Sequence, residues 1–284
     1  MSTNSLTLNN ATITGGNGAS GGGILNYNTL TLNNSTVSGN TASGFGGGIY
    51  NYGGTLTLNN STVSGNMANH GGGISNYGTL TLNNSTVSGN TGNSNGGGIH
   101  NFAGTTTLNR SMVSGNTSPL GAEIRRSSGT ITAADHNVFG HSGQTNAQAF
   151  SNFTPGATDI TATSDGTTPT VLASILNPTL ANNGGSTLTH ALVTGSPAID
   201  IVPLDGSVCI LDTSTDQRGG VRGSGANRGD GACDAGAYEF NSNQIPSAVT
   251  DLLTQTTSQP PTTILALLAT LLAAFSGVRL WRRR

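Results

Sequence analysis

Five near-identical copies of one sequence unit occupy residues 6–126, and this repeat limits the possible folds more than any other feature of the chain. The copies open with LTLNNATITGG, three times LTLNNSTVSGN, and TTLNRSMVSGN, and the first four continue into a GGGI corner and an Asn-aromatic pair. Repeats of this length indicate a solenoid, in which each copy buries its apolar face only by stacking on its neighbours. The leucine markers are spaced by 24, 26, 24 and 26 residues, and the isoleucine markers by a constant 25: Leu8, Leu32, Leu58, Leu82, Leu108, and Ile24, Ile49, Ile74, Ile99, Ile124.

The changes in spacing fall in two stretches of the unit, before the glycine triplet and after the Asn-aromatic pair. Insertions confined to corners indicate a coil built from strands and turns. A helical repeat would need an amphipathic run of about ten residues or more, and the unit contains none. We therefore predict an all-β, single-stranded parallel β-helix solenoid, right-handed, with three short strands per coil. In the first copy these strands lie around Thr7–Leu8, Ile13 and Ile24.

Stacking in register, about 4.8 Å per coil, predicts columns of identical side chains. Leu, Val and Ile point inward, and stacked asparagines hydrogen-bond along the axis. The glycine triplets are expected to supply the positive φ of a tight corner. Two asparagine ladders and one aromatic column follow: Asn10, Asn34, Asn60, Asn84; Asn26, Asn51, Asn76, Asn101; and Tyr27, Tyr52, Tyr77, Phe102.

The chain divides into four segments by composition. Residues 1–140 form the β-helix coils, 141–240 irregular coils and a capping module, 241–262 a flexible linker rich in Ser, Thr, Gln and Pro, and 263–284 an apolar segment with a basic end. Charges replace asparagine and aromatic residues where the repeat decays, and we expect the 141–240 segment to cap the stack against aggregation.

Three elements in the 141–240 segment carry a family resemblance: GSPAID, TDQRG and CDAGAYE, with a cysteine before the second and another at the start of the third. Over roughly residues 130–240 the chain resembles the bacterial surface β-helix proteins called choice-of-anchor Q proteins. The upstream coils are also similar to polymorphic outer membrane protein repeats. The resemblance implies surface display by one of several anchors, and it implies no established reaction.

The same segment gathers most of the opposite charges in a chain that has only 8% charged residues. We interpret them as structural ion pairs, and the alternative is a calcium or sugar site. The chain's two cysteines fit one disulfide that closes a loop, worth about 3 kcal/mol, while a reduced pair is the alternative. The residues are Cys209 and Cys233, and the charge cluster Asp200, Asp216, Arg218, Arg222, Asp234 and Glu239.

The apolar run 263–280 is just long enough to cross a bilayer as a helix, and Arg282–Arg284 follow it as a positive-inside signal. It resembles bacterial C-terminal sorting signals but has no LPxTG, and QPP stands where PEP is expected. We therefore predict a cell-surface protein anchored to the membrane by this helix. Export requires a signal peptide, and we expect one upstream of Met1.

The sequence disfavours an enzyme. Residues 1–122 contain no Asp or Glu, so no carboxylate pair can line the coils for acid–base work. His70 and His100 sit at variable corners and are expected to be exposed, and two GxSxG strings lack the context of a nucleophile elbow. A net charge of −2 gives no basis for nucleic acid binding, and no motif predicts a metal or cofactor.

We predict a non-catalytic, adhesin-like or structural protein whose partners are surface glycans or other solenoids. One alternative is a polysaccharide lyase or glycoside hydrolase that uses Asp200, Asp216 and Asp234. The other is a truncated gene product without activity.

Overall fold

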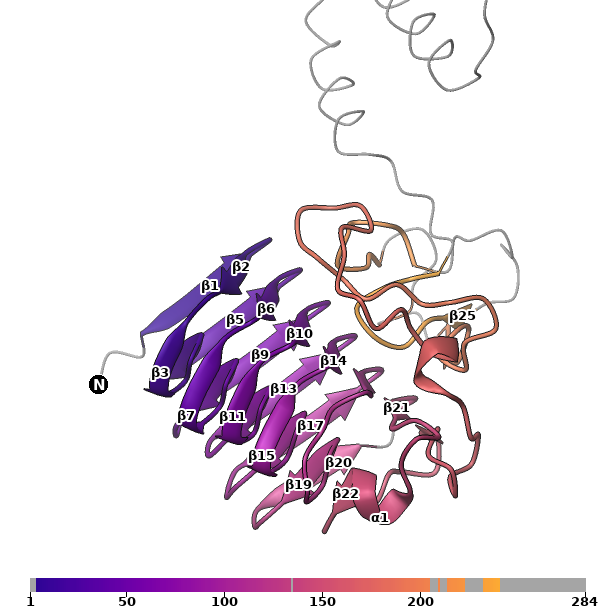
Figure 1. Ribbon diagram of the computed structural model, residues 1–284. Coiled ribbons are helices and arrows are strands. Elements are labelled where there is room, and N and C mark those ends of the chain that lie inside the picture. Colours follow the sequence, from indigo (N-terminus) through magenta and orange to yellow (C-terminus); the bar gives the residue numbers. More distant parts are fainter. Residues whose placement is uncertain (1–3, 134, 205–208, 210–213, 223–231, 241–284) are drawn as a thin grey trace, which may run out of the picture. The chain divides into compact units, whose positions relative to one another are not determined.

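The computed structural model describes residues 4–133, 135–204, 209, 214–222 and 232–240. These residues form an all-β parallel solenoid of about six turns, which confirms the fold expected from the repeat (Figure 1). Equivalent residues of successive copies pair in register, as Leu8 does with Leu32 and Leu32 with Leu58. The leucines, valines and isoleucines of the repeat lie in one continuous core inside the coil.

The strands belong to four parallel sheets. Sheet A contains β1 (Ser5–Asn9), β5 (Thr29–Asn33), β9 (Thr55–Asn59), β13 (Thr79–Asn83), β17 (Thr105–Asn109) and β20 (Thr130–Ala133). Sheet B contains β2 (Thr12–Thr14), β6 (Thr36–Ser38), β10 (Thr62–Ser64), β14 (Thr86–Ser88), β18 (Met112–Val113), β21 (Val138–Phe139) and β23 (Ile160–Thr161). Sheet C contains β3 (Asn17–Ser20), β7 (Thr41–Phe45), β11 (Met67–His70) and β15 (Thr91–Asn95). Sheet D contains β4 (Ile24–Asn26), β8 (Ile49–Asn51), β12 (Ile74–Asn76), β16 (Ile99–Asn101), β19 (Ile124–Arg126) and β22 (Phe150–Ser151).

Short elements outside the four sheets complete the described part of the chain. They are the helix α1 (Asn146–Ala149), the 3-10 turn η1 (Leu172–Ser174), and the antiparallel pair β24 (Val202–Pro203) and β25 (Ala232–Cys233).

Each of the first four coils has four strands, so the expectation of three was wrong. The extra strand lies in sheet C, in one of the two stretches where the repeat changes length. Its pairings contain register shifts, for example between Ala68 and His70. A β-bulge absorbs an extra residue without ending the ladder, which explains how a strand can form where the repeat length varies.

The two asparagines of each LNN motif have different roles. The side-chain ladder was expected at the second asparagine of the motif: Asn10, Asn34, Asn60 and Asn84. These four residues instead have a left-handed backbone, with φ between 46° and 53°, and the ladder runs through the first asparagine of each motif. Asparagine tolerates this conformation better than other non-glycine residues. The amide ladder joins Asn33 to Asn9 at 2.8 Å and Asn59 to Asn33 at 2.9 Å, and continues through Asn83 and Asn109.

The second expected ladder lies inside the coil. The Nδ2 of Asn26 donates to Oδ1 of Asn51 at 2.7 Å, and the same bond repeats from Asn51 to Asn76 and from Asn76 to Asn101. These amides also donate to backbone carbonyls of the corner, such as Gly54 O. They satisfy polar groups that burial would otherwise leave unpaired.

Glycine is required at the positions of each triplet for two separate physical reasons. Only the first glycine of a triplet has positive φ, as Gly46 does at 63°. The second and third are glycine because the neighbouring coil passes too close: a Cβ on Gly47 would lie 2.4 Å from the carbonyl oxygen of Met67. The expectation that the whole triplet supplies positive φ was therefore correct for one residue in three.

The segment from about residue 170 to 240 packs along the side of the stack, against sheet B (Figure 1). The outward residues of the first four strands of sheet B are Thr and Ser, small enough for close approach and able to hydrogen-bond. The Oγ1 of Thr62 donates to Gln217 Oε1 at 2.6 Å, and the amide of Gln217 donates to Thr36 Oγ1 at 2.8 Å. A second apolar cluster, including Met112, Val138 and Ile175, packs between this segment and sheet B. The expected cap is thus a lateral cover for sheet B.

The predicted linker and membrane helix, residues 241–262 and 263–284, lie outside the described residues. Within the part of the chain that the structure describes, no helix is long and apolar enough to cross a membrane.

Candidate binding face

Aromatic rings from three positions of the repeat meet where sheet C turns into sheet D. One position is the end of the sheet C strand, the second is the middle of the sheet D strand, and the third follows that strand directly. Their backbones lie in adjacent coils, so the stacking of the solenoid brings the rings together. We call this cluster the aromatic face, and it consists of Tyr27, Phe45, Tyr50, Tyr52, His70, Tyr77, His100 and Phe102.

The expected aromatic column forms the outer edge of this face. The ring centroids of Tyr27 and Tyr52 are 5.6 Å apart, and those of Tyr52 and Tyr77 are 5.8 Å apart. Tyr77 and Phe102 stack at 4.4 Å with an interplanar angle of 18°. Tyr27 and Tyr52 are 59% and 50% exposed, which leaves much of these rings open to a ligand.

A second layer of rings lies behind the column. Phe45 stacks on Tyr50 at 5.5 Å and on His70 at 5.0 Å, and its ring also meets Phe102 edge-on at 6.0 Å. Tyr50 is only 8% exposed and His100 only 1%. The expectation that His100 is exposed was therefore wrong, because rings from neighbouring coils cover it.

Three buried polar atoms on neighbouring strands of sheet D have no hydrogen-bond partner among the described residues. They are Ser75 Oγ, His100 Nδ1 and Arg125 Nε, on the three neighbouring strands β12, β16 and β19. His100 uses its other ring nitrogen, Nε2, in a hydrogen bond of 2.8 Å with Ser127 Oγ. Buried polar groups are normally satisfied, so three unpaired atoms on adjacent strands are unusual, but all three are covered from solvent and cannot contact a ligand in this conformation.

Burial disfavours the charged forms of Tyr50, His70 and His100. It raises the pKa of Tyr50 to about 12, with smaller contributions from neighbouring tyrosines. Burial, with His70 and Arg125 nearby, lowers the pKa of His100 to about 4, and burial also lowers the pKa of His70. The face therefore offers aromatic rings and neutral imidazoles beside the cation of Arg125.

The predicted charge cluster is held in ion pairs and hydrogen bonds. Arg218 lies 2.6 Å from the carboxylate of Asp216, and its guanidinium stacks 3.6 Å above the ring centre of Tyr238. Arg222 lies 3.1 Å from Glu239 and also donates to Asn60 Oδ1 of the coil. These contacts join the segment to itself and to sheet B.

Asp234 and Asp200 belong to the same cluster. The Asp234 carboxylate accepts hydrogen bonds from the backbone N–H groups of Asp200 and Phe240. Burial, and then the nearby Glu239, raise the pKa of Asp234 to about 8, against the opposing effect of Arg222. Cys209 and Cys233 are joined by a disulfide. No group of three or more His, Cys, Asp or Glu side chains among the described residues is arranged to hold a metal ion.

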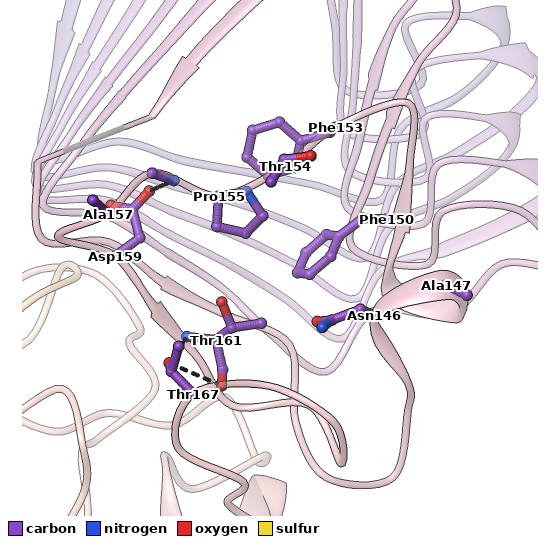
Figure 2. Close-up of a pocket in the computed structure, with 11 residues that line it drawn as sticks. Asn146, Ala147, Phe150, Phe153, Thr154, Pro155, Ala157, Asp159, Thr161 and Thr167 are labelled. Atoms are coloured by element: carbon purple, nitrogen blue, oxygen red, sulfur yellow. Dashed lines mark hydrogen bonds between the residues drawn. The ribbon is translucent and has the colours of Figure 1, made fainter.

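A cavity of about 380 Å³ lies near the C-terminal end of the coils. Figure 2 shows Phe150, Phe153 and Pro155 on one side of it and Thr161 and Thr167 on another. Its polar groups are paired with the protein: Asp159 accepts from Asn137 and Gly156, and Thr161 N–H donates to Thr167 Oγ1.

Sequence reasoning found the outer column but missed the inner rings and one further ladder. Phe45, Tyr50 and His70 fall at positions where other copies carry different residues, so no column of identical residues revealed them. The missed ladder runs through the asparagine of SGN, which is present in four of the five copies, and joins Asn40, Asn66, Asn90 and Asn116 by hydrogen bonds of 2.9 Å. Its regular spacing was a sufficient signal.

No protein-family model matches this chain, and the searches of curated proteins and of solved structures found no match.

Proposed function

We propose that this chain is a non-catalytic, surface-anchored β-solenoid that binds glycans through the aromatic face. The observation that carries the proposal is the continuous column of Tyr27, Tyr52 and Tyr77, whose rings contact one another along the solenoid axis and are exposed or half-buried. Sugar rings present C–H groups that pack on aromatic faces, and hydroxyl groups that need hydrogen-bond partners. The resemblance to choice-of-anchor Q proteins and the apolar, arginine-ended tail support display at the cell surface.

The carboxylates argue against the alternative of a glycan-cleaving enzyme. Asp216 and Asp234 are buried, and each accepts hydrogen bonds from backbone N–H groups. A general acid or base must reach the bond that it cleaves, and buried, paired carboxylates do not. We therefore assign these aspartates to holding the segment together.

Affinity electrophoresis of the full chain, in gels that contain single polysaccharides, tests the proposal. We expect retardation by at least one polysaccharide and its loss in the double variant Tyr52→Ala/Tyr77→Ala. Met67→Ala is the matched control, because Met67 is also exposed but lies on sheet C. Retardation that survives the tyrosine substitutions would contradict the proposed face.

Two further measurements separate the alternatives. Release of reducing or unsaturated sugar ends by the wild type, abolished by Asp216→Asn, would identify an enzyme. Protease treatment of intact cells should release peptides from residues 127–240 while the tail stays in the membrane fraction. Protection of these peptides in intact cells would contradict surface display, and absence of the protein would support a truncated gene product.

A further inference from the structure

The outward face of sheet A carries a Thr-x-Thr motif on nearly every strand. Alternate residues of a strand point to the same side, so the two threonines face outward and the residue between them points into the core. Leu30, Leu56 and Leu80 are these inward residues, and all three are buried. The outward residues form two columns, with one serine among eleven threonines: Ser5, Thr29, Thr55, Thr79, Thr105, Thr130, and Thr7, Thr31, Thr57, Thr81, Thr107, Thr132.

Parallel pairing in register makes this face a regular two-dimensional array. Neighbouring strands are about 4.8 Å apart, and alternate residues along one parallel strand are about 6.6 Å apart. The register holds from β1 to β20 without a shift. Figure 1 shows the six strands side by side along the stack. From the first strand to the sixth, the array therefore extends about 24 Å.

The array is open to solvent and carries no charge. Thr29, Thr55, Thr79 and Thr105 are exposed, and the second column is half-buried between its neighbours over most of its length. Among the described residues of the 170–240 segment, Gln217 and His190 hydrogen-bond to sheet B rather than to this face. The outward residues that continue the strands are asparagines, Asn33 and its equivalents, so the whole described face is neutral.

The threonine side chains are held in a repeating arrangement. A β-branched side chain has a restricted χ1, so each hydroxyl and each methyl group repeats its position from coil to coil. One hydrogen bond joins hydroxyls of these columns within the described residues, from Thr130 to Thr105 at 3.3 Å. The other described hydroxyls of these columns can hydrogen-bond to solvent or to a ligand that covers the face. Because they are already ordered, little conformational entropy is lost on binding.

We propose that this threonine face binds ice. Each hydroxyl contact with water is weak, so the face gains affinity only for a ligand that repeats with the same period across its whole area. The two spacings of the array lie close to the repeat distances between water oxygens on a prism face of hexagonal ice. A neutral face suits a neutral lattice, since charged side chains would hold their own hydration shells in its place. The threonine face on sheet A is separate from the aromatic face proposed to bind glycans, which lies where sheet C turns into sheet D.

Partition of the full chain into a slowly growing ice shell tests the proposal. We expect enrichment of the wild type in the ice fraction, where an unrelated protein is excluded. The double variant Thr55→Tyr/Thr79→Tyr should lose this enrichment, because two bulky rings prevent flat contact while tyrosine remains favourable in a strand. Thr41→Tyr is the matched control, since Thr41 is an exposed strand residue of sheet C. It should partition as the wild type does.

Two controls are needed: the variants must be folded, and binding to ice must be compared with binding to crystalline polysaccharides. Circular dichroism must show that the double variant is folded, and Thr55→Lys/Thr79→Lys replaces it if it is not. Exclusion of the wild type from ice, or undiminished enrichment of the folded variant, overturns the proposal. Binding to microcrystalline cellulose or chitin but not to ice also overturns it, and assigns the face to a crystalline polysaccharide. Loss of ice binding in Tyr52→Ala/Tyr77→Ala would place the activity on the aromatic face and likewise overturn it.

Discussion

The side-chain amide of Asn116 donates a hydrogen bond of 2.6 Å to the carboxyl group of Glu123, at the last rung of an internal asparagine ladder. Every rung of this ladder donates toward the C-terminal end of the stack, so the final Nδ2 needs an acceptor that requires no further partner. A carboxyl oxygen meets this need. Glu123 also accepts from the backbone N–H groups of Gly115 and Asn116, which completes the end of the ladder.

We predict that the stability of the protein falls as the pH rises from about 4.5 to about 8. Burial raises the pKa of Glu123 from 4.5 to about 8, against the opposing effect of its hydrogen bonds. Over this window the folded protein holds a proton that the unfolded chain has lost, so the free energy of unfolding decreases with pH. The contribution is fully present below the unfolded pKa and lost above the folded one. Asp234, whose pKa burial also raises to about 8, acts in the same direction.

Thermal unfolding between pH 4 and pH 9 measures this effect. Glu123→Gln should flatten the dependence of Tm on pH, because the side chain no longer titrates. Asp165→Asn, which removes an exposed carboxylate, is the comparison variant. A slope unchanged by Glu123→Gln would show that Glu123 does not titrate in this window.

The buried ladder should be far more sensitive to substitution than the exposed one. Asn66→Ala removes the acceptor of Asn40 N–H and Nδ2 and the donor to Val37 O and Asn90 Oδ1. Each buried polar group left unpaired costs roughly 1–3 kcal/mol, so we expect a total loss of about 4 kcal/mol. Asn59→Ala interrupts a partly exposed ladder, where water replaces the lost partners, and should cost about 1 kcal/mol or less. Urea unfolding compares the two, and equal losses would contradict the role given to burial.

The coil could be predicted because each contact between neighbouring coils recurs at the same position of every repeat. The 25-residue step of the isoleucines fixes which residues stack, so the Asn26 ladder and the tyrosine column followed from position alone. The Asn10 column failed for a local reason: both asparagines of the LNN motif repeat equally well, and only the backbone conformation shows which one is left-handed.

Contacts that occur only once in the described structure could not be predicted from the periodicity of the sequence. Gln217 lies between Thr36 and Thr62, which are 181 and 155 residues away from it, and no periodicity connects them. The burial of His100 depends on rings that vary between copies, so its position in the repeat did not indicate its surroundings. The described residues of the 141–240 segment make contacts that do not repeat along the chain. The position of this segment along the side of the solenoid was therefore not predicted.

Gln217→Ala should loosen the 170–240 segment from sheet B while the coils stay folded. The substitution leaves the hydroxyls of Thr36, Thr62 and Thr187 without their shared partner. We expect faster hydrogen exchange in the segment and little change in β5, β9 and β13. Gln148→Ala, at an exposed position near the end of the coils, is the control. Exchange that rises equally in the segment and the coils would mean that the two unfold as one unit.

Glycine should be required at Gly47 for a different reason than at Gly53. A Cβ on Gly47 would lie 2.4 Å from Met67 O and 2.5 Å from Gly72 O, both backbone atoms of the next coil. Since backbone cannot move aside without breaking the stack, we expect Gly47→Ala to cost roughly 3 kcal/mol or more. Gly53 has φ of 77° but nothing within 4 Å of its would-be Cβ. Gly53→Ala should therefore cost only the left-handed penalty of about 1–2 kcal/mol. Denaturant unfolding of both variants gives the comparison, and a smaller loss for Gly47→Ala than for Gly53→Ala would refute close packing as the reason for the triplet.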